Sequence, residues 1–218
     1  MSTAIIGVGN IGKAVATHLV AGGEDVIVAA STQANAEKLA DELGGSASAA
    51  TVTDAVERAD TVILAVWHDP MKELVQQLGS ALDGKIVVDP SNPIAASEDG
   101  QYARTLPDDV SAASIIADLL HPGAHLVKAF GTLGADALAS NANRSPDRAV
   151  LFYASDGETA DRVVERLIST AGFDPVKVGG LDQATRLEMF GDLHQYGALN
   201  GEVLNAEHAR AAVKRAPA

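Results

Sequence analysis

The sequence of 218 residues contains no cysteine, and aromatic residues make up only 4% of it. Without cysteine, disulfides, thiol nucleophiles and thiolate-bound metals are excluded. No run approaches the roughly 20 consecutive apolar residues that a membrane-spanning helix needs, so we expect no membrane partner. The first residues lead into an apolar segment without a basic stretch or a cleavage site, and we therefore expect a cytoplasmic protein.

Positive charge is also scarce. Lys and Arg number 16 against 29 Asp and Glu, which gives a formal net charge of −13. An acidic surface favours solubility and repels nucleic acid, so we expect no nucleic-acid partner. An anionic ligand would have to be bound by local backbone dipoles and a few side chains, because the overall field repels it.

Short aliphatic runs alternate with helix-length amphipathic segments, which is typical of repeated strand–helix–strand units. The runs are continuous rather than alternating, as strands of a parallel sheet require when helices cover both faces. We expect strands at residues 4–8, 26–30, 61–66, 85–88, 126–130, 150–154 and 175–178. The pattern predicts an α/β fold with a doubly wound, mostly parallel sheet.

Helices are expected between these strands, at residues 11–20, 34–43, 70–82, 111–120 and 159–171. A final helical stretch is expected over residues 183–213, although Gly191, Gly197 and Gly201 interrupt it. These glycines indicate either a helix broken in one or two places or close packing against another helix, such as one of a second subunit.

A glycine-rich sequence, GVGNIG over residues 7–12, follows the first expected strand and opens the first expected helix. This is the G-x-G-x-x-G pattern of dinucleotide-binding Rossmann folds in the context that it requires. Gly7 permits the tight turn, Gly9 lets the backbone approach a pyrophosphate, and Gly12 allows the helix to pack on the strand. The start of the helix then offers N–H donors and a positive dipole to the phosphates.

The segment 140–148, rich in Asn, Ser and Pro, is the best candidate for a domain boundary. We expect a dinucleotide-binding Rossmann domain over residues 1–140. A smaller αβ and helical extension over residues 148–218 packs on it, or the two parts form one continuous domain.

The end of the second expected strand determines which dinucleotide binds. An acidic residue there would hydrogen-bond the ribose 2′-hydroxyl of NAD and repel a 2′-phosphate. Residues 29–33, Ala-Ala-Ser-Thr-Gln, contain no acid, and Ser31 and Thr32 can donate hydrogen bonds to a 2′-phosphate. NADP is therefore the expected cofactor, with NAD left open because no arginine is present either.

Further motifs occur at residues 64–68 (LAVWH), 89–94 (DPSNPI), 126–132 (LVKAFGT), 179–183 (GGLDQ) and 186–188 (RLE). With the glycine loop, they make the sequence resemble the family of NADP-dependent coenzyme F420 oxidoreductases over nearly its whole length. The fold of that family also resembles the N-terminal domain of pyrroline-5-carboxylate reductase. The resemblance implies hydride transfer between the nicotinamide and a second ring system, bound in a cleft at the strand carboxyl ends, usually in a homodimer.

The resemblance also implies roles for individual residues. The pyrophosphate would be cradled by Gly7, Gly9, Asn10, Ile11 and Gly12, and the 2′-phosphate would meet Ser31 and Thr32, where the family commonly has arginines nearby. Val66, Trp67 and His68 would border the adenosine ribose or the nicotinamide. The cofactor-binding residues Asn92, Pro93 and Ala129 would face the nicotinamide, and Phe130 and Thr132 would face the substrate. Coenzyme F420 is the co-substrate that the family implies, although Trp67, Phe130 and Tyr196 are among few rings available for stacking.

Hydride transfer needs no dedicated acid, because the cofactor carries the reactive chemistry. If a proton must be supplied, His68 is the first catalytic candidate, since it follows a strand at the cleft side and titrates near neutrality. An exposed loop histidine that caps the next helix is the other interpretation. Lys128 is either a cofactor contact or a strand-end lysine that reaches solvent.

No metal site is expected, because His121 and His125 flank a turn without a carboxylate at ligand spacing. The sequence thus predicts an oxidoreductase that transfers a hydride between NADP(H) and a deazaflavin or a similar flavin-like acceptor. Two alternatives stay open. One is NAD(P)H-dependent reduction of a small imine, ketone or quinone, and the other is a dinucleotide-binding sensor without turnover.

Overall fold

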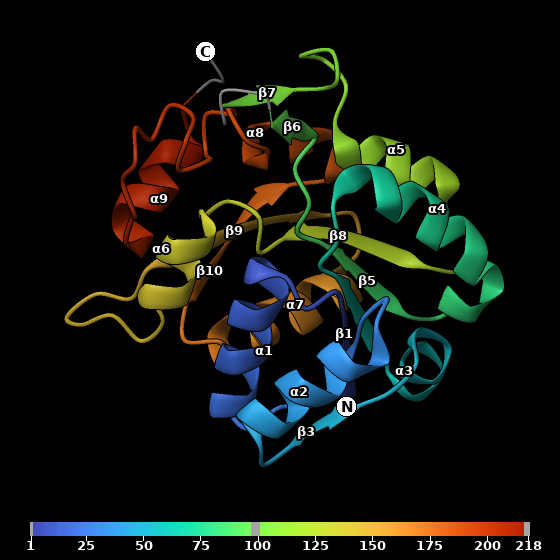
Figure 1. Ribbon diagram of the computed structural model, residues 1–218. Coiled ribbons are helices and arrows are strands. Elements are labelled where there is room, and N and C mark those ends of the chain that lie inside the picture. The colour runs from blue at the N-terminus through green and yellow to red at the C-terminus, as the bar shows by residue number, and fades with distance from the viewer. Residues whose placement is uncertain (1, 97–100, 216–218) are drawn as a thin grey trace.

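A computed structural model describes residues 2–96 and 101–215. Strands and helices alternate through most of this range (Figure 1). The first half contains β1 (Ser2–Ile6), α1 (Asn10–Ala21), β2 (Asp25–Ala29), α2 (Gln33–Leu43), β3 (Ala47–Ala49), α3 (Val52–Arg58), β4 (Thr61–Leu64), α4 (His68–Leu78), η1 (Gly79–Leu82) and β5 (Ile86–Asp89). The second half contains β6 (Ile94–Ala96), β7 (Tyr102–Arg104), α5 (Ala112–Leu119), β8 (His125–Ala129), α6 (Ala135–Ser140), β9 (Val150–Ser155), α7 (Glu158–Thr170), β10 (Asp174–Gly179), η2 (Leu181–Gln183), α8 (Ala184–Leu187) and α9 (Ala206–Val213).

Eight of the strands form one sheet in the order β10–β9–β8–β5–β4–β1–β2–β3. From β8 to β3 all neighbours are parallel, and central β1 pairs Ile5 with Val28 on one side and with Ile63 on the other. β9 runs antiparallel to β8, and β10 is parallel to β9. The predicted mostly parallel Rossmann-type sheet is confirmed, and strands from both sides of segment 140–148 belong to it.

Helices cover both faces of the sheet, which explains why the strands consist of continuous apolar runs. α1, α2 and α7 pack on one face, and α3, α4, α5 and α8 pack on the other (Figure 1). A third apolar cluster joins β9 and β10 to α9 and to the irregular segment before it. In the described part of the chain, no helix combines the length and apolar character needed to cross a membrane.

The C-terminal segment differs from the prediction. A helical stretch over residues 183–213 is wrong, because only η2, the four-residue α8 and α9 are helical and the chain between α8 and α9 is irregular. A Cβ at Gly191 would lie 2.4 Å from the Thr185 carbonyl oxygen, and one at Gly197 would lie 1.8 Å from the Gly191 carbonyl oxygen. The glycines therefore allow this segment to fold tightly onto its own backbone.

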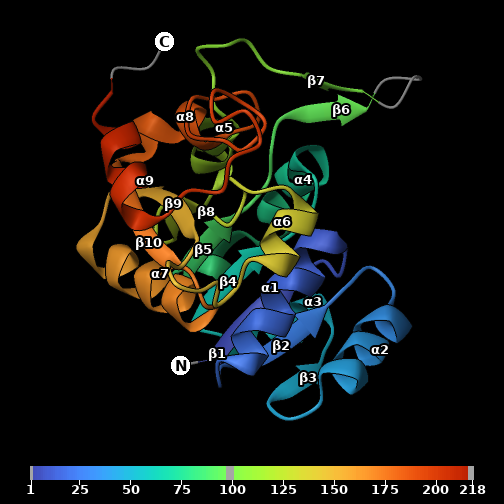
Figure 2. The ribbon, with the colours of Figure 1, turned by 90° about the vertical axis from the view of Figure 1, so that its left-hand side faces the viewer.

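A small antiparallel hairpin, β6–β7, lies outside the main sheet, at the end of the molecule opposite to the N-terminus (Figures 1 and 2). It follows β5 directly and was not predicted, because each of its strands has only three residues. The hairpin extends the molecule beyond the edge where the parallel strands end. It thereby supplies one wall of the site described next.

Candidate functional site

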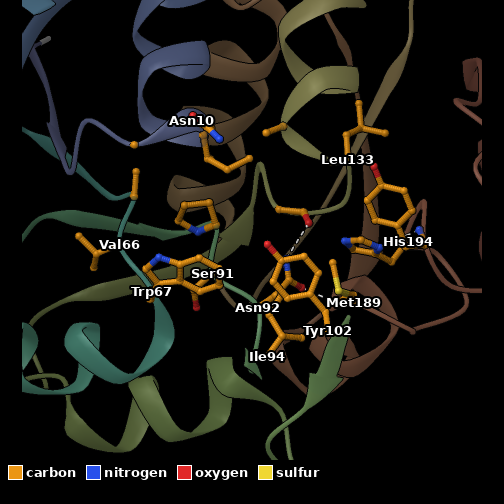
Figure 3. A pocket seen from close by; sticks show the side chains of 18 of the residues that line it. Asn10, Val66, Trp67, Ser91, Asn92, Ile94, Tyr102, Leu133, Met189 and His194 are labelled. Atoms are coloured by element: carbon orange, nitrogen blue, oxygen red, sulfur yellow. Dashed lines mark hydrogen bonds between the residues drawn. The ribbon is translucent and has the colours of Figure 1, made fainter. Parts of the chain in front are cut away.

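A cavity of about 560 Å³ opens at the carboxyl ends of β1, β4, β5 and β8. Open α/β sheets bind their ligands in a crevice at this edge. Its wall combines the loops after these strands with the hairpin and the irregular C-terminal segment (Figure 3). The described lining residues are Gly9, Asn10, Ile11, Ala65, Val66, Trp67, Pro90, Ser91, Asn92, Ile94, Tyr102, Gly131, Leu133, Gly134, Ala135, Asp136, Met189, His194 and Tyr196.

The three loop glycines meet different demands. Gly7 has a φ of +106°, and a Cβ there would lie 2.3 Å from the Ala65 carbonyl oxygen. A Cβ at Gly12 would lie 2.0 Å from the Gly7 carbonyl oxygen, so α1 packs directly on the loop. Gly9 is under no such constraint, because a Cβ there would have no described atom of the chain within 4 Å. The space beside Gly9 therefore belongs to the cavity rather than to protein packing.

The start of α1 faces this space. Gly9 is the N-cap residue, so no side chain caps the helix, and its first turn contains no acidic residue. Unpaired N–H groups and the positive end of the helix dipole make such a terminus suitable for phosphate. Asn10 and Ile11 line the cavity here, as the glycine-loop prediction requires. The local structure fits a dinucleotide pyrophosphate.

Ser31 and Thr32 lie at the end of β2, outside the described lining of this cavity, and both are exposed. Thr32 is the N-cap of α2, and its side chain makes no capping hydrogen bond to any described residue. The first turn of α2 carries no acidic residue. Both hydroxyls are therefore free to bind a ligand group at this helix terminus.

Aromatic rings form two sides of the cavity. Trp67, just before α4, and Tyr102, from β7, have ring centroids 6.4 Å apart and ring planes 34° apart. His194 and Tyr196, from the irregular C-terminal segment, have centroids 5.8 Å apart. Figure 3 shows Val66 and Trp67 on one side of the cavity and His194 on the other. The sequence indicated Trp67 and Tyr196 as available rings but gave no signal for Tyr102.

Asn92 connects three parts of the wall. Its Nδ2 donates to the Gly131 carbonyl oxygen at 3.1 Å, and its Oδ1 accepts from the Met189 backbone N–H at 2.6 Å. The side chain thus links the loop after β5 to the loop after β8 and to the C-terminal segment. Asn92 was expected at the cofactor site and does line the cavity.

Behind this wall lies a buried ionic network that sequence reasoning missed. The Nζ of Lys128 lies 2.9 Å from the Asp89 Oδ2 and donates to the Ser91 carbonyl oxygen at 2.6 Å. Glu188 Oε1 lies 3.8 Å from the same Nζ, and Arg104 donates to Glu188 Oε2 at 3.2 Å. Lys128 is only 2% exposed and does not line the cavity, so both interpretations of it are corrected.

Buried charges are costly unless they are paired, so the loss of any one member of this network would leave an unpaired charge in the interior. Burial raises the pKa of the Glu188 carboxyl, and the charges of Lys128 and Arg104 partly offset this. The network joins β5, β8, β7 and the segment after α8. These elements and the loops that follow β5 and β8 carry four residues of the cavity wall, namely Ser91, Gly131, Tyr102 and Met189. Its role here is to fix the relative positions of the cavity wall.

His68 is neither an exposed cap nor a residue of the cavity wall. It is 4% exposed at the start of α4, and neither ring nitrogen has a hydrogen-bond partner among the described residues. Burial lowers its pKa, so the neutral ring dominates at neutral pH. The expectation of a proton donor that faces the cleft is therefore corrected, because the chain turns into α4 with Trp67 outward and His68 inward.

The histidine that does line the cavity is His194. Its Nδ1 accepts the Tyr196 backbone N–H at 3.0 Å, and its ring also donates to the Gly131 backbone. Burial lowers the pKa of His194 to about 4, despite that donation. Sequence reasoning placed this residue on a helix, so its position in the site could not be found.

The loop after β8 also differs from expectation. Ala129, Phe130 and Thr132 are buried and do not line the cavity, and the same holds for Pro93 after β5. Phe130 has a φ of +64° and its ring packs in the core. The backbone reversal at Phe130 brings Gly131 to the wall instead, where a Cβ would lie 2.4 Å from the Pro90 carbonyl oxygen.

The Rossmann sheet, the glycine loop and the cavity beside it are the features of a dinucleotide-binding fold. The model of the family described as NADP oxidoreductase, coenzyme F420-dependent, matches residues 2–93. Over 94% of this chain and 95% of that protein, the chain is 34% identical to a hypothetical protein from Sinorhizobium meliloti, with a TM-score of 0.81. Through its residues 2–93, the chain belongs to the family described as NADP oxidoreductase, coenzyme F420-dependent.

Two further solved structures share the fold. A putative F420-dependent NADP reductase from an Arthrobacter species is 21% identical, with a TM-score of 0.72 over 85% of this chain and 87% of that one. A pyrroline-5-carboxylate reductase from Coxiella burnetii is 16% identical, with a TM-score of 0.63 over 85% of this chain and 61% of that one. The predicted relation to the N-terminal domain of the latter enzyme is confirmed at the level of the fold.

Proposed function

We propose that this chain transfers a hydride between NADP(H) and a planar ring acceptor of the deazaflavin or flavin type. One observation carries the proposal: a single cavity runs from Gly9 at the glycine loop to the rings of Tyr102 and Tyr196. Hydride transfer needs the donor and acceptor carbons close together in a site with little water. A continuous cavity with a phosphate-binding end and an aromatic end would bring the two carbons close together.

The cofactor half would be formed by the backbone at Gly9, Asn10 and Ile11, with Val66 and Asn92 on the way to the nicotinamide. Bound NADPH would supply the hydride. The absence of an acid at residues 29–33 supports NADP over NAD, because a 2′-phosphate would meet no repulsion from them. The family description and the name of the Arthrobacter neighbour point to the same cofactor.

The two histidines near the cavity act by positioning rather than by proton transfer. His194 is neutral with both nitrogens occupied, and His68 is buried behind the wall. Reduction of an imine or a ketone would call for a side-chain acid beside the substrate. Transfer to a ring that can take its proton from solvent does not, so the histidines favour the ring acceptor over the imine or ketone.

Absorbance-monitored oxidation of NADPH and, separately, of NADH tests this function, with a deazaflavin and then a flavin as the acceptor. We expect turnover with NADPH to exceed turnover with NADH. We also expect the acceptor to be reduced in equal amount. Tight binding of NADPH without oxidation by any ring acceptor would contradict the proposal and favour a sensor.

A further inference from the structure

The exposed aromatic side chains gather at one place on the molecule. In the described part of the chain, four large hydrophobic side chains are exposed: Trp67 (58%), Tyr102 (48%), Phe190 (49%) and Tyr196 (52%). Three of them line the cavity, and the fourth follows Met189, which lines it too. Exposed apolar surface that is concentrated in a concave site marks ligand binding. Trp67 with Tyr102, and His194 with Tyr196, form two pairs of neighbouring rings in the cavity wall, and Figure 3 shows Trp67 and His194 on opposite sides of the cavity.

Outside the glycine loop, the described lining of the same cavity offers no cationic side chain to a negatively charged group. None of the described lining residues is Lys or Arg, and Asp136 adds a carboxylate. The two nearby cations are already paired, Lys128 with Asp89 and Arg104 with Glu188. The net charge of −13 adds a general repulsion. An acceptor with a phosphate or carboxylate tail would therefore form no ion pair with the described lining of this cavity.

We propose that the acceptor half of the cavity binds an uncharged planar ring compound, such as a flavin, deazaflavin or quinone nucleus without an anionic tail. This inference rests on the proposed function and names its substrate class. The rings of Trp67, Tyr102 and Tyr196 recognise the acceptor by stacking, and Asp136 acts against anionic derivatives. The affinity for an acceptor depends mainly on its ring system, and a phosphate group on the acceptor lowers that affinity.

Riboflavin and FMN form the matched pair that tests the inference, because they differ only in one phosphate. Trp67 is the only tryptophan of the chain and lies on the cavity wall, so its fluorescence reports binding without any turnover. Each ligand is titrated into the protein saturated with NADP⁺, with correction for absorbed light. We expect riboflavin to bind at least about tenfold more tightly than FMN, which corresponds to ~1.4 kcal/mol.

Two variants give the comparison its control. Tyr102→Leu removes a wall ring and should weaken riboflavin binding by about tenfold, in the range of one lost stacking contact. Phe190→Leu removes an equally exposed ring outside the described wall and should leave binding unchanged. Asp136→Asn should reduce the difference in binding affinity between FMN and riboflavin.

Equal or tighter binding of FMN would overturn the inference, and so would the absence of any Trp67 response to riboflavin. The proposed function fails in a different assay, namely when no ring acceptor oxidises NADPH. Binding of riboflavin over FMN without NADPH oxidation would therefore reject the function while retaining the binding preference.

Discussion

Lys128 and Asp89 form an ion pair in the interior of the protein, at the ends of the adjacent strands β8 and β5. Their charged atoms lie 2.9 Å apart, and the side chains are 2% and 0% exposed. Asp89 also accepts the backbone N–H of Ser91 at 2.7 Å, and Lys128 donates to the carbonyl oxygen of the same residue. The pair thus fixes the position of the loop after β5, which contributes Ser91 and Asn92 to the cavity wall.

Lys128→Met should destabilise the protein by about 3–5 kcal/mol, because it leaves the Asp89 carboxylate buried without its partner. Urea denaturation measures this loss. Lys13→Met is the matched control, since Lys13 pairs with Glu42 at 2.6 Å on the surface and should cost less than about 1 kcal/mol. Equal stability of the two variants would show that the buried pair contributes no more than the surface pair.

Gly9→Ala separates cofactor binding from folding. The added Cβ has no described atom within 4 Å, and the φ of −69° suits alanine, so the loss of stability should be about 1 kcal/mol, the typical cost of alanine at a helix N-cap. The methyl group occupies the space proposed for the pyrophosphate, so NADPH binding should weaken by about tenfold or more, ~1.4 kcal/mol.

Gly157→Ala is the control for that experiment. Gly157 is also a helix N-cap glycine, at α7, and a Cβ there has no described neighbour within 4 Å either. Its variant should bind NADPH as the wild type does, as measured by calorimetry. Unchanged NADPH affinity in Gly9→Ala would rule out phosphate binding at the glycine loop.

Ser31→Asp should reverse part of the cofactor preference. A carboxylate at this exposed position would repel a 2′-phosphate, and NADPH should lose about tenfold in affinity relative to NADH, given ~1–4 kcal/mol for two close unit charges near a surface. Ser31→Asn has nearly the same size without the charge and should keep the wild-type ratio. If both variants bind NADPH and NADH in the wild-type ratio, Ser31 does not meet the phosphate.

His194 should make the protein less stable in mild acid. Its pKa falls from about 6.5 in the unfolded chain to about 4 in the folded protein, because burial disfavours the charged ring. Between these two pKa values the unfolded state binds more protons than the folded state. The free energy of unfolding is therefore unaffected by His194 above pH ~6.5 and decreases as the pH falls towards ~4. The full loss amounts to about 3 kcal/mol.

Denaturation at a series of pH values tests this claim with His194→Gln, which should lose less stability between pH ~6.5 and ~4 than the wild type. Burial also lowers the pKa of His68, so the comparison with the wild type isolates the part due to His194. His208→Gln, on the exposed side of α9, should keep the wild-type dependence. Parallel curves for wild type and His194→Gln would contradict the assignment.

The sheet and the glycine loop could be predicted because they are encoded locally. A continuous apolar run marks each long strand, and the spacing of Gly7, Gly9 and Gly12 specifies a turn before a helix. Most expected strand and helix limits agree with the structure within about two residues, which is the usual ambiguity of element ends.

The acceptor side of the site could not be predicted, because its residues come from short or irregular segments without periodicity. Tyr102 lies on a three-residue strand, and His194 and Tyr196 lie in the irregular segment between α8 and α9, which was expected to be helical. The Lys128–Asp89 pair joins residues 39 positions apart, and it requires the β5–β8 pairing that the sequence does not specify. Phe130 faces the core because of one backbone reversal.

Direct hydride transfer is the central claim, and isotopic labelling tests it most directly. NADPH deuterated at the nicotinamide C4 position, in each of its two stereochemical forms, is oxidised by the purified protein with a deazaflavin that lacks an anionic tail. The accepting position of a deazaflavin is a carbon, so it retains transferred deuterium for mass spectrometry. The account predicts one deuterium in the reduced acceptor from one of the two forms. Oxidation of both forms without label in the acceptor would contradict it.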